Sequence, residues 1–336
     1  MAPVEGNDWK RVEILPGVIG QSVAMQAAAA RVALIAETDA TGLLIGETGT
    51  GKELFARAIH YLSSRKPGPF VPVNCGAIPD HLFENELFGH VRGAYTDARS
   101  NERGLLAYAE NGTLFLDEVD ALSASAQVKI LRVLQEREYR PVGSAHTVAA
   151  NIRFVAATNS QLEHRVESHQ FREDLYFRLN VLSLRIPPLR ERLEDVAALT
   201  AHYVREYASV HHRPVTGFDH SVVERLHSYR WPGNVRELQA VIQRAVLTAR
   251  SSTLRAGDLD LADGAATTGD HLTMKAAKKV AVSHCERNYL SAVLSRCEGN
   301  VTQAAKMAGK ERRSFQRLLR KYSITTIPFK SEPKNA

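Results

Sequence analysis

The 336-residue sequence contains only three cysteines, Cys75, Cys285 and Cys297, and no two of them have the CxxC spacing of a zinc or redox motif. Neither disulfides nor a zinc site are therefore expected, and small buried thiols in a reducing compartment are the simpler interpretation. No apolar run is long enough to span a bilayer. The first ten residues carry acids and lack the apolar core of a secretory signal. These absences predict a cytoplasmic protein without a membrane anchor.

The composition is that of an ordinary globular protein, with 44% hydrophobic and 24% charged residues, and the length allows two or three domains. The net charge of +6 is concentrated in one segment. Between Val301 and Tyr322 seven Lys and Arg residues stand against the single acid Glu311, which gives this segment the excess of the whole chain. A short cationic segment predicts contact with a phosphate backbone, although a solvated helix face has the same composition.

Apolar patterning predicts an α/β fold followed by helices. Helical patterns precede and follow the first apolar run, and later segments at 192–210 and 220–250 are helical without convincing strands. A parallel sheet with helices on both faces is therefore expected. The runs expected to form its buried strands are Thr41–Ile45, Gly112–Leu116 and Ile152–Ala157, and the first two expected helices are Gln21–Ala36 and Lys52–Ser63.

A glycine-rich segment between the first strand and the second helix predicts a phosphate-binding loop. Its glycines allow successive backbone N–H groups to converge on phosphate oxygens, and Lys52 would reach the β- and γ-phosphates of ATP. Glu53 stands where the general pattern has a Ser or Thr that binds Mg²⁺. A glycine-rich turn without a ligand is the alternative. The residues assigned to this phosphate loop are Gly46, Glu47, Thr48, Gly49, Thr50, Gly51, Lys52 and Glu53.

Two further strand ends carry polar groups. The apolar run that ends at Leu116 is followed by Asp117 and Glu118. Asp117 would hold Mg²⁺, directly or through water, and Glu118 would polarise the attacking water. The third run ends in Thr158 and Asn159, which are suited to sensing the γ-phosphate. Taken singly, the acids would be merely solvated and Thr158 and Asn159 a turn signal, but the upstream phosphate loop favours the catalytic interpretation of the acids.

The C-terminal part predicts a helix-turn-helix. Thr302 is expected to cap a short helix from Gln303 to Ala308, and Gly309 supplies the turn before a basic helix from about 312 to 322. A helical pattern over Lys275–Cys297 precedes it. Phe315, Leu318 and Leu319 would bury the second helix, and a protein-binding hairpin is the alternative. The residues assigned to DNA contact are Thr302, Arg312, Arg313, Ser314, Gln316, Arg317 and Arg320.

The order of these motifs resembles bacterial enhancer-binding proteins, the activators of sigma-54 RNA polymerase, which combine an AAA+ domain with a Fis-type helix-turn-helix. In that family Glu commonly follows the phosphate-loop lysine, so Glu53 fits the pattern. The segments that carry the resemblance are GETGTGKE at 46–53, VNC at 73–75, ELFGHVRGAYTDA at 86–98, GTLFLDE at 112–118, AATN at 156–159, FREDLYFRLNV at 171–181, WPGNVREL at 231–238 and NVTQAAKMAG at 300–309.

The resemblance implies further roles for single residues. Asn74 would be a switch that pairs with Glu118 and reports the nucleotide state. Arg172 and Arg178 would be arginine fingers that enter the neighbouring subunit's site, so that hydrolysis depends on assembly of a ring, a hexamer in the family. Arg236 would be a second sensor that contacts nucleotide from a helical lid.

The family's sigma-54 contact loop has the consensus GAFTGA. Tyr95 keeps an aromatic ring, whereas Asp97 replaces a glycine and adds both a charge and a Cβ atom. A loop that still engages sigma-54 in altered form is favoured. The alternative is a regulator that has lost this partner and acts as a repressor or on sigma-70 promoters. The corresponding residues are Gly93, Ala94, Tyr95, Thr96, Asp97 and Ala98.

The resemblance thus implies a sigma-54-dependent activator that binds upstream double-stranded DNA as a dimer and uses ATP with Mg²⁺ to remodel the closed complex of the RNA polymerase holoenzyme. A AAA+ remodeller of proteins or DNA is a further alternative. No sensory domain precedes residue 17, so control by a regulatory protein acting in trans, or by the protein's own expression, is expected. The expected division is an extension at 1–16, an α/β subdomain at 17–187, a lid at 188–261, a linker at 262–271, the DNA-binding domain at 272–325 and a tail at 326–336.

Overall fold

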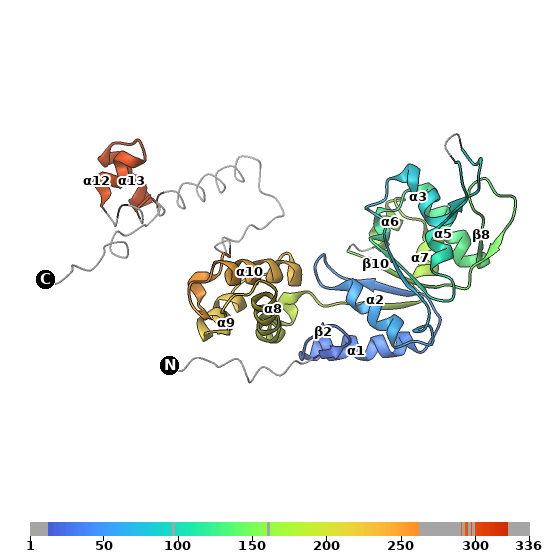
Figure 1. Ribbon diagram of the computed structural model, residues 1–336, viewed down its shortest axis with the longest axis horizontal. Coiled ribbons are helices and arrows are strands. Elements are labelled where there is room, and N and C mark those ends of the chain that lie inside the picture. The colour runs from blue at the N-terminus through green and yellow to red at the C-terminus, as the bar shows by residue number, and fades with distance from the viewer. Residues whose placement is uncertain are drawn as a thin grey trace. The chain divides into compact units, whose positions relative to one another are not determined.

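The computed structural model of the chain forms two compact units, which divide between Gly264 and Ala265 (Figure 1). The expected linker and tail lie outside the described residues, as do most of the expected N-terminal extension and most of the helical pattern at 275–297. The structure describes residues 13–95, 98–159, 162–261, 290, 293–294, 297 and 300–321.

Five parallel strands form the central sheet of the first unit, in the order β11-β3-β10-β7-β4. The register pairs Val155 of the central strand with Gly42 on one side and Phe115 on the other. Because all five strands run in the same direction, their carboxyl ends lie along one edge of the sheet. The strands are β3 (Gly42–Ile45), β4 (Phe70–Asn74), β7 (Thr113–Asp117), β10 (Arg153–Thr158) and β11 (Leu182–Arg185).

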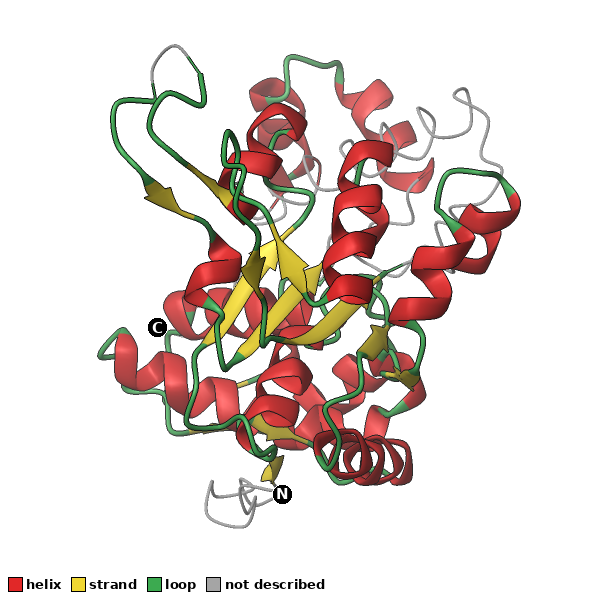
Figure 2. Cartoon of the chain, turned by 90° about the vertical axis from the view of Figure 1, so that its right-hand side faces the viewer, coloured by secondary structure: helices red, strands yellow, loops and turns green. Residues whose placement is uncertain are grey.

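Helices cover both faces of this sheet, as expected (Figures 1 and 2). Alternate strand residues face opposite sides. Leu44 and Phe115 pack with α1 (Val23–Ala36) and α2 (Lys52–Tyr61), so the two helices that flank the first strand in sequence share one face. The other face, which includes Leu43, is covered by α3 (Asp80–Phe88), α4 (Leu105–Tyr108), α5 (Ala124–Glu136) and α7 (Glu173–Leu179).

Short elements connect these layers at the surface. Three antiparallel pairs stand apart from the main sheet, and a turn of 3₁₀-helix follows β7 directly. The pairs are β1 (Glu13–Leu15) with β2 (Val18–Ile19), β5 (Gly89–His90) with β6 (Glu102–Arg103) and β8 (Glu138–Tyr139) with β9 (Val148–Ala149); the remaining elements are η1 (Val119–Ala121) and α6 (Leu162–Glu167).

The part of the first unit that follows β11, the lid, is mainly helical. The helical pattern at 220–250 forms two helices, and the chain turns where Trp231 and Asn234 adopt left-handed φ values of 55° and 52°. A two-residue parallel pair, β12 (Gly217–Phe218) with β13 (Thr253–Leu254), corrects the expectation of a lid without strands. A two-residue strand is too short to show the alternation of apolar and polar residues that marks a strand in a sequence. The helices are η2 (Leu189–Glu191), η3 (Leu193–Asp195), α8 (Val196–Val210), α9 (His220–His227), α10 (Asn234–Thr248) and η4 (Ala256–Asp258).

The second unit contains the two short helices of the expected helix-turn-helix, α12 (Val301–Met307) and α13 (Arg312–Lys321). Gly309 between them has a φ of 64°, and no atom lies within 4 Å of a Cβ built on it, so glycine is needed for its conformation and not for space. Both helices share a core in which Phe315 is fully buried. The other buried members are Leu290, Val293, Leu294, Cys297, Ala304, Ala305 and Leu319, with Leu318 half-buried.

The cap of α12 differs from the expected one. Asn300, not Thr302, is the N-cap residue: its Oδ1 accepts hydrogen bonds from the backbone N–H groups of Thr302 at 3.1 Å and Gln303 at 3.3 Å. The helix begins at Val301, which places Thr302 inside its first turn, where a side chain is no longer in the capping position. The expectation that Thr302 caps the helix is therefore wrong.

The described cysteines are buried free thiols, as expected for Cys75 and Cys297. Burial raises the pKa of the Cys75 thiol to about 12, so this side chain behaves as a small apolar group and not as a nucleophile. Cys285 lies outside the described residues. In the part of the chain that the structure describes, no helix is long and apolar enough to cross a membrane.

Candidate nucleotide site and DNA-binding unit

The phosphate loop joins β3 to α2 at the carboxyl edge of the sheet. Gly49 and Gly51 have φ values of 81° and 98°, which glycine adopts without a steric penalty. Lys52 is the first residue of α2, and its Nζ donates to the carbonyl oxygens of Gly46 at 2.8 Å and Glu47 at 3.3 Å. Burial lowers the pKa of the Lys52 ammonium. A helix N-terminus beside a buried cation is the arrangement that binds phosphate groups.

The two predicted acids follow one another at the end of β7. Burial raises the pKa of the Asp117 carboxyl group, and the nearby charge of Lys52 opposes this shift. Oδ1 of Asp117 accepts the backbone N–H of Glu118 at 2.9 Å. Glu118 itself has φ 55° and ψ 47°, a left-handed conformation that costs energy in a residue with a Cβ atom. Such strain is typical of residues whose position matters for catalysis.

Asn74 ends the neighbouring strand β4 and is paired in register with Asp117. Its Oδ1 accepts hydrogen bonds from the backbone N–H groups of Gly76 at 2.9 Å and Ala77 at 3.1 Å. A Cβ built on Gly76 would lie 2.8 Å from Oε2 of Glu118 and 3.4 Å from Oδ1 of Asn74. The two side chains thus approach the same glycine from the ends of neighbouring strands, and their direct pairing stays a prediction.

Thr158 and Asn159 at the end of β10 have different surroundings. Thr158 is fully buried: its Oγ1 donates to Oδ1 of Asp120 at 2.7 Å, and its carbonyl oxygen accepts the N–H of Gly46 at 3.2 Å. It therefore links the phosphate loop to the segment that follows Glu118. Asn159 is exposed, which leaves its side chain accessible at this edge of the sheet.

The lid contacts the phosphate loop through the N-terminus of α10. The backbone N–H groups of Val235 and Arg236 donate to the carbonyl oxygen of Gly49 at 3.0 and 3.3 Å. A Cβ built on Gly49 would overlap the carbonyl oxygen of Gly233 and lie 3.1 Å from the Cβ of Arg236. Glycine at position 49 is therefore required by both space and conformation. Arg236, the predicted second sensor, is held next to the phosphate loop.

Glu47 connects the phosphate loop to the lid through its side chain. Arg190 donates from Nη1 to Oε2 at 2.7 Å and from Nη2 to Oε1 at 2.6 Å, and this contact lowers the pKa of Glu47. The fully buried Asn234 donates to Oε2 of Glu47 and to the carbonyl oxygen of Thr48, both at 3.1 Å, and accepts the N–H of Leu189 at 2.8 Å. We refer to Glu47, Arg190 and Asn234 as the lid clasp. The sequence does not predict that Arg190 or Asn234 binds the loop.

The two predicted arginine fingers lie on the surface at the two ends of α7. Arg172 directly precedes the helix, and its Nη2 forms an ion pair with Oδ2 of Asp174 at 2.7 Å. Arg178 is exposed and has no ion-pair partner among the described residues, and the neighbouring Phe177 is 64% exposed. Neither guanidinium makes a hydrogen bond or ion pair with the Lys52–Asp117 site of its own chain.

The predicted sigma-54 contact loop lies between β5 and β6. The N–H of Gly93 donates to the carbonyl oxygen of Ala98 at 2.9 Å, and Gly93 has a φ of 83°. Tyr95 is 47% exposed, with its ring centroid 5.1 Å from that of His90. Thr96 and Asp97 lie outside the described residues. The part of the loop that is described thus presents an aromatic ring on a closed turn.

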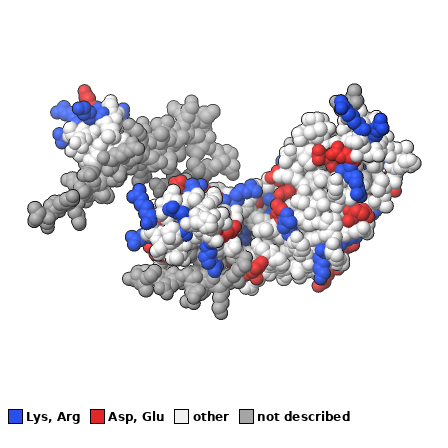
Figure 3. All heavy atoms as spheres, viewed as in Figure 1, with Lys and Arg blue, Asp and Glu red and all other residues white. Residues whose placement is uncertain are grey.

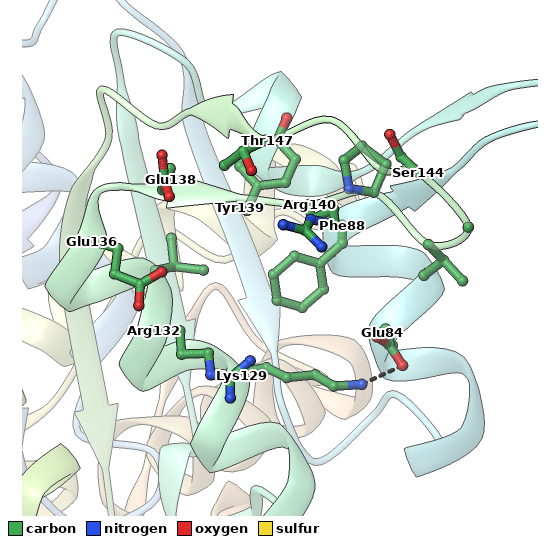
Figure 4. Close-up of a pocket in the computed structure, with 14 residues that line it drawn as sticks. Glu84, Phe88, Lys129, Arg132, Glu136, Glu138, Tyr139, Arg140, Ser144 and Thr147 are labelled. Carbon is green, nitrogen blue, oxygen red and sulfur yellow. Dashed lines mark ion pairs between the residues drawn. The ribbon is translucent and has the colours of Figure 1, made fainter.

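A pocket of about 380 Å³ lies beside this loop (Figure 4). It is lined by α3, α5, β8 and the loop after β8, and Figure 4 shows the ion pair of Lys129 with Glu84 at its rim. Phe88 and Tyr139 supply aromatic surface. None of the site residues predicted from the sequence lines this pocket, so it is separate from the candidate nucleotide site.

The helix-turn-helix exposes most of the residues predicted to contact DNA. Thr302, Arg312, Arg313, Gln316 and Arg317 are exposed and Ser314 is half-buried, whereas the side chain of Arg320 lies outside the described residues. Figure 3 shows Lys and Arg side chains gathered at the surface of the described part of this unit. Exposed basic groups on α13, opposite the buried Phe315, give the charge distribution that a recognition helix requires.

A five-stranded parallel sheet with a phosphate loop after β3, an Asp-Glu pair after β7 and a helical lid defines an AAA+ P-loop NTPase, and a helix-turn-helix unit accompanies it. Three family models match the chain in this order: Sigma-54 interaction domain at 18–185, AAA+ ATPase lid domain at 190–275, and Bacterial regulatory protein, Fis family, at 282–322.

Relatives agree with these matches. The chain is 42% identical over 329 residues to the transcriptional regulatory protein GlrR of Escherichia coli, covering 98% of this chain and 72% of that protein. It is 40% identical over 312 residues to the regulatory protein AtoC of the same species, covering 91% and 68%. A crystal structure of NtrX from Brucella abortus in complex with ATP is similar with a TM-score of 0.67 and 30% identity, covering 91% of this chain and 70% of that chain.

The chain therefore belongs to the sigma-54-dependent transcriptional activators. It is a DNA-binding ATPase that activates transcription by sigma-54 RNA polymerase. The matches give no support to the alternative of a repressor or a sigma-70 regulator.

Proposed function

We propose that ATP is hydrolysed between protomers of a ring, with Lys52, Asp117 and Glu118 supplied by one protomer and Arg172 and Arg178 by the next. The observation that carries this proposal is the exposure of both arginines on α7, without a contact to the site of their own chain. A guanidinium that enters from a neighbour stabilises charge developing on the γ-phosphate, and a single protomer then lacks part of its active site. A hexamer is proposed by analogy with the family.

Within this site each group of the chain has a chemical task. Lys52 binds the β- and γ-phosphates from the start of α2, and Glu118 orients and polarises the attacking water. The left-handed backbone of Glu118 sets the direction of its side chain at the end of β7, and Gly76, which has no Cβ atom, leaves space for the carboxylate. Arg236 would bind phosphate from the lid, and Asn74 and Asn159 would respond to the presence of the γ-phosphate.

Asp117 fits a role as the Mg²⁺ ligand. Burial disfavours its ionised form, and a bound cation would stabilise that form. The described residues contain no cluster of three His, Cys, Asp or Glu side chains, which agrees with Mg²⁺, since this ion usually binds one or two carboxylates and completes its shell with phosphates and water. When bound, Mg²⁺ neutralises charge on the phosphates.

We further propose that hydrolysis moves the loop at 93–98 against sigma-54, with the exposed Tyr95 ring as the main contact. A dimer of the helix-turn-helix units would hold the assembly at upstream DNA through the exposed basic residues of α13. A regulatory protein acting in trans would control ring assembly.

Transcription in vitro from a sigma-54 promoter tests this mechanism. We expect the unaltered chain to form open complexes with ATP, and Glu118→Gln to bind ATP and DNA without opening the promoter. Arg178→Ala should lower ATP hydrolysis at least about 100-fold, since a finger arginine is worth about a thousandfold or more. If Arg178→Ala hydrolysed ATP at the unaltered rate, the shared site would be wrong. Asp97→Gly, which restores the family's loop residue, should open the promoter at least as well as the unaltered chain.

A further inference from the structure

Gln127 is a buried residue of α5 whose side chain connects two separate segments of the AAA+ core. Only 2% of its surface is exposed. Its Oε1 accepts the backbone N–H of Arg172 at 2.9 Å. Its Nε2 donates to the carbonyl oxygens of Leu122 at 3.0 Å and Gln170 at 3.2 Å. One side chain therefore holds the backbone on both sides of Phe171 and the backbone of Leu122, the residue directly after η1.

A primary amide is the group that these surroundings require. It offers one acceptor oxygen to the one N–H group, and two donor hydrogens to the two carbonyl oxygens. The opposite orientation of the amide would place donor against donor and oxygen against oxygen, so the network fixes its direction. The hydrogen bond from Gln127 to the carbonyl oxygen of Leu122 is buried, so loss of the amide would leave this oxygen unpaired.

The segment held in this way is the start of α7. Arg172 is its N-cap residue and has an extended backbone, with φ −74° and ψ 132°, and no side chain caps the helix. Phe171, which is 3% exposed, anchors the segment in the core. The hydrogen bond from the N–H of Arg172 to Gln127 fixes the residue at which the chain turns outward. The direction in which the exposed Arg172 and Arg178 leave the surface depends on that turn.

We propose that Gln127 is a positioning residue for the arginines that one protomer donates to the next. Its three hydrogen bonds all go to backbone groups, and through them it fixes the backbone from which Arg172 and the rest of α7 extend. This inference rests on the proposed function, in which both arginines act in trans. It predicts that a Gln127 variant keeps a competent site of its own and fails as a donor of arginines.

Mixing full-length variants separates these two abilities. Gln127→Met removes all three hydrogen bonds at similar length, and Gln127→Glu keeps the shape and the acceptor but removes both donors. Each is mixed with Glu118→Gln, which has an inactive site and intact arginines. We expect each Gln127 variant alone to hydrolyse ATP about 10- to 100-fold more slowly with little change in ATP affinity, since misplacement by about 1 Å costs up to about 100-fold. The mixture should recover activity several-fold above either component, because the competent sites receive intact arginines.

Two references make the outcomes distinct. The double variant Arg172→Ala/Arg178→Ala, mixed with Glu118→Gln, must recover activity if the arginines act in trans; its failure would contradict the proposed function itself. If this reference recovers and neither Gln127 variant does, or if both Gln127 variants alone are fully active, the inference about Gln127 is overturned. Gln135→Met, at an exposed position of the same helix, should leave hydrolysis unchanged. Should Gln127→Met fold poorly by circular dichroism, Gln127→Glu decides the question.

Discussion

Glu47 of the phosphate loop and Arg190 of the lid form a two-point ion pair, with nitrogen–oxygen distances of 2.7 and 2.6 Å. The pair joins residues 143 positions apart in the sequence. Because one partner lies in the segment that receives phosphate and the other at the start of the lid, the position of the lid is tied to the conformation of the loop.

Arg190→Ala should therefore weaken ATP binding by about two- to fivefold. Both side chains are partly exposed, and such a pair contributes at most about 1 kcal/mol. A nucleotide titration monitored by fluorescence measures the change. Arg244→Ala is the matched control, because Arg244 is a lid arginine that is 51% exposed and pairs with Asp260. Equal affinities for the two variants would show that the clasp does not act on nucleotide.

Gly76→Ala should slow ATP hydrolysis by about 10- to 100-fold while ATP binding stays nearly unchanged. The added Cβ would lie 2.8 Å from Oε2 of Glu118, so the carboxylate that orients water has to move. Steady-state hydrolysis and a separate binding titration distinguish the two effects. Gly257→Ala, where no atom lies within 4 Å of the new Cβ, should affect neither quantity. A full hydrolysis rate in Gly76→Ala would mean that Glu118 tolerates displacement.

Asp117→Asn should stabilise the fold at neutral pH while it abolishes hydrolysis. Folding raises the pKa of Asp117 above the ordinary 3.8, so the ionised carboxylate opposes folding at pH 7 and a neutral amide relieves this cost. The gain should be complete above the raised pKa and vanish below pH 3.8, where the carboxyl group is protonated in the folded and unfolded chain alike. Urea unfolding at several pH values measures it.

Asp39→Asn provides a control of opposite sign for this pH series. The hydrogen bond and charge of Arg65 lower the pKa of Asp39. The carboxylate of Asp39 therefore stabilises the fold above pH 3.8, and this contribution is lost as the pH falls through the lowered pKa. The variant should be less stable than the unaltered chain at pH 7, with the deficit closing in acid. Effects of the same sign at both positions would contradict the assigned electrostatics.

Asn300→Ala should destabilise α12 by about 1 kcal/mol, because the helix loses the side chain that caps two backbone N–H groups. Thr302→Ala should destabilise the helix by only a small fraction of that free energy, since Thr302 lies within the first turn. Hydrogen exchange of the amides of Thr302 and Gln303, measured by mass spectrometry, reports the difference. A larger effect at Thr302 than at Asn300 would restore the cap expected from the sequence.

The sequence revealed the central strands and missed the edges of the sheet for a physical reason. β3, β7 and β10 are buried on both faces and read as continuous apolar runs. β4 contains Pro72 and β11 contains Ser183 and Arg185, because edge strands tolerate residues that lack a donor or that reach solvent. These two strands therefore show no uninterrupted pattern.

In the candidate site, too, some residues are predictable from the sequence and others are not. Lys52, Asp117 and Glu118 stand in contiguous motifs, so local patterns are sufficient to predict their roles. The partners that hold the motifs in place come from distant segments: Arg190 binds Glu47, and Gln127 binds the backbone of Arg172. Neither contact has a signature in a short window, because a buried glutamine or a surface arginine is compatible with many environments. Only the folded chain identifies them.

The carbonyl oxygen of Gly49 receives the amide protons of both Val235 and Arg236. Solvent deuterium reaches those two positions only when the first turn of α10 separates from the phosphate loop. The rate of deuterium uptake by the peptide that contains them, measured by mass spectrometry, therefore reports the rate of lid opening without an attached dye. If the protomers of a ring occupy different stages of the ATPase cycle, this peptide would take up deuterium at several rates. The fraction of the peptide that exchanges at each rate would then give the fraction of protomers in each stage.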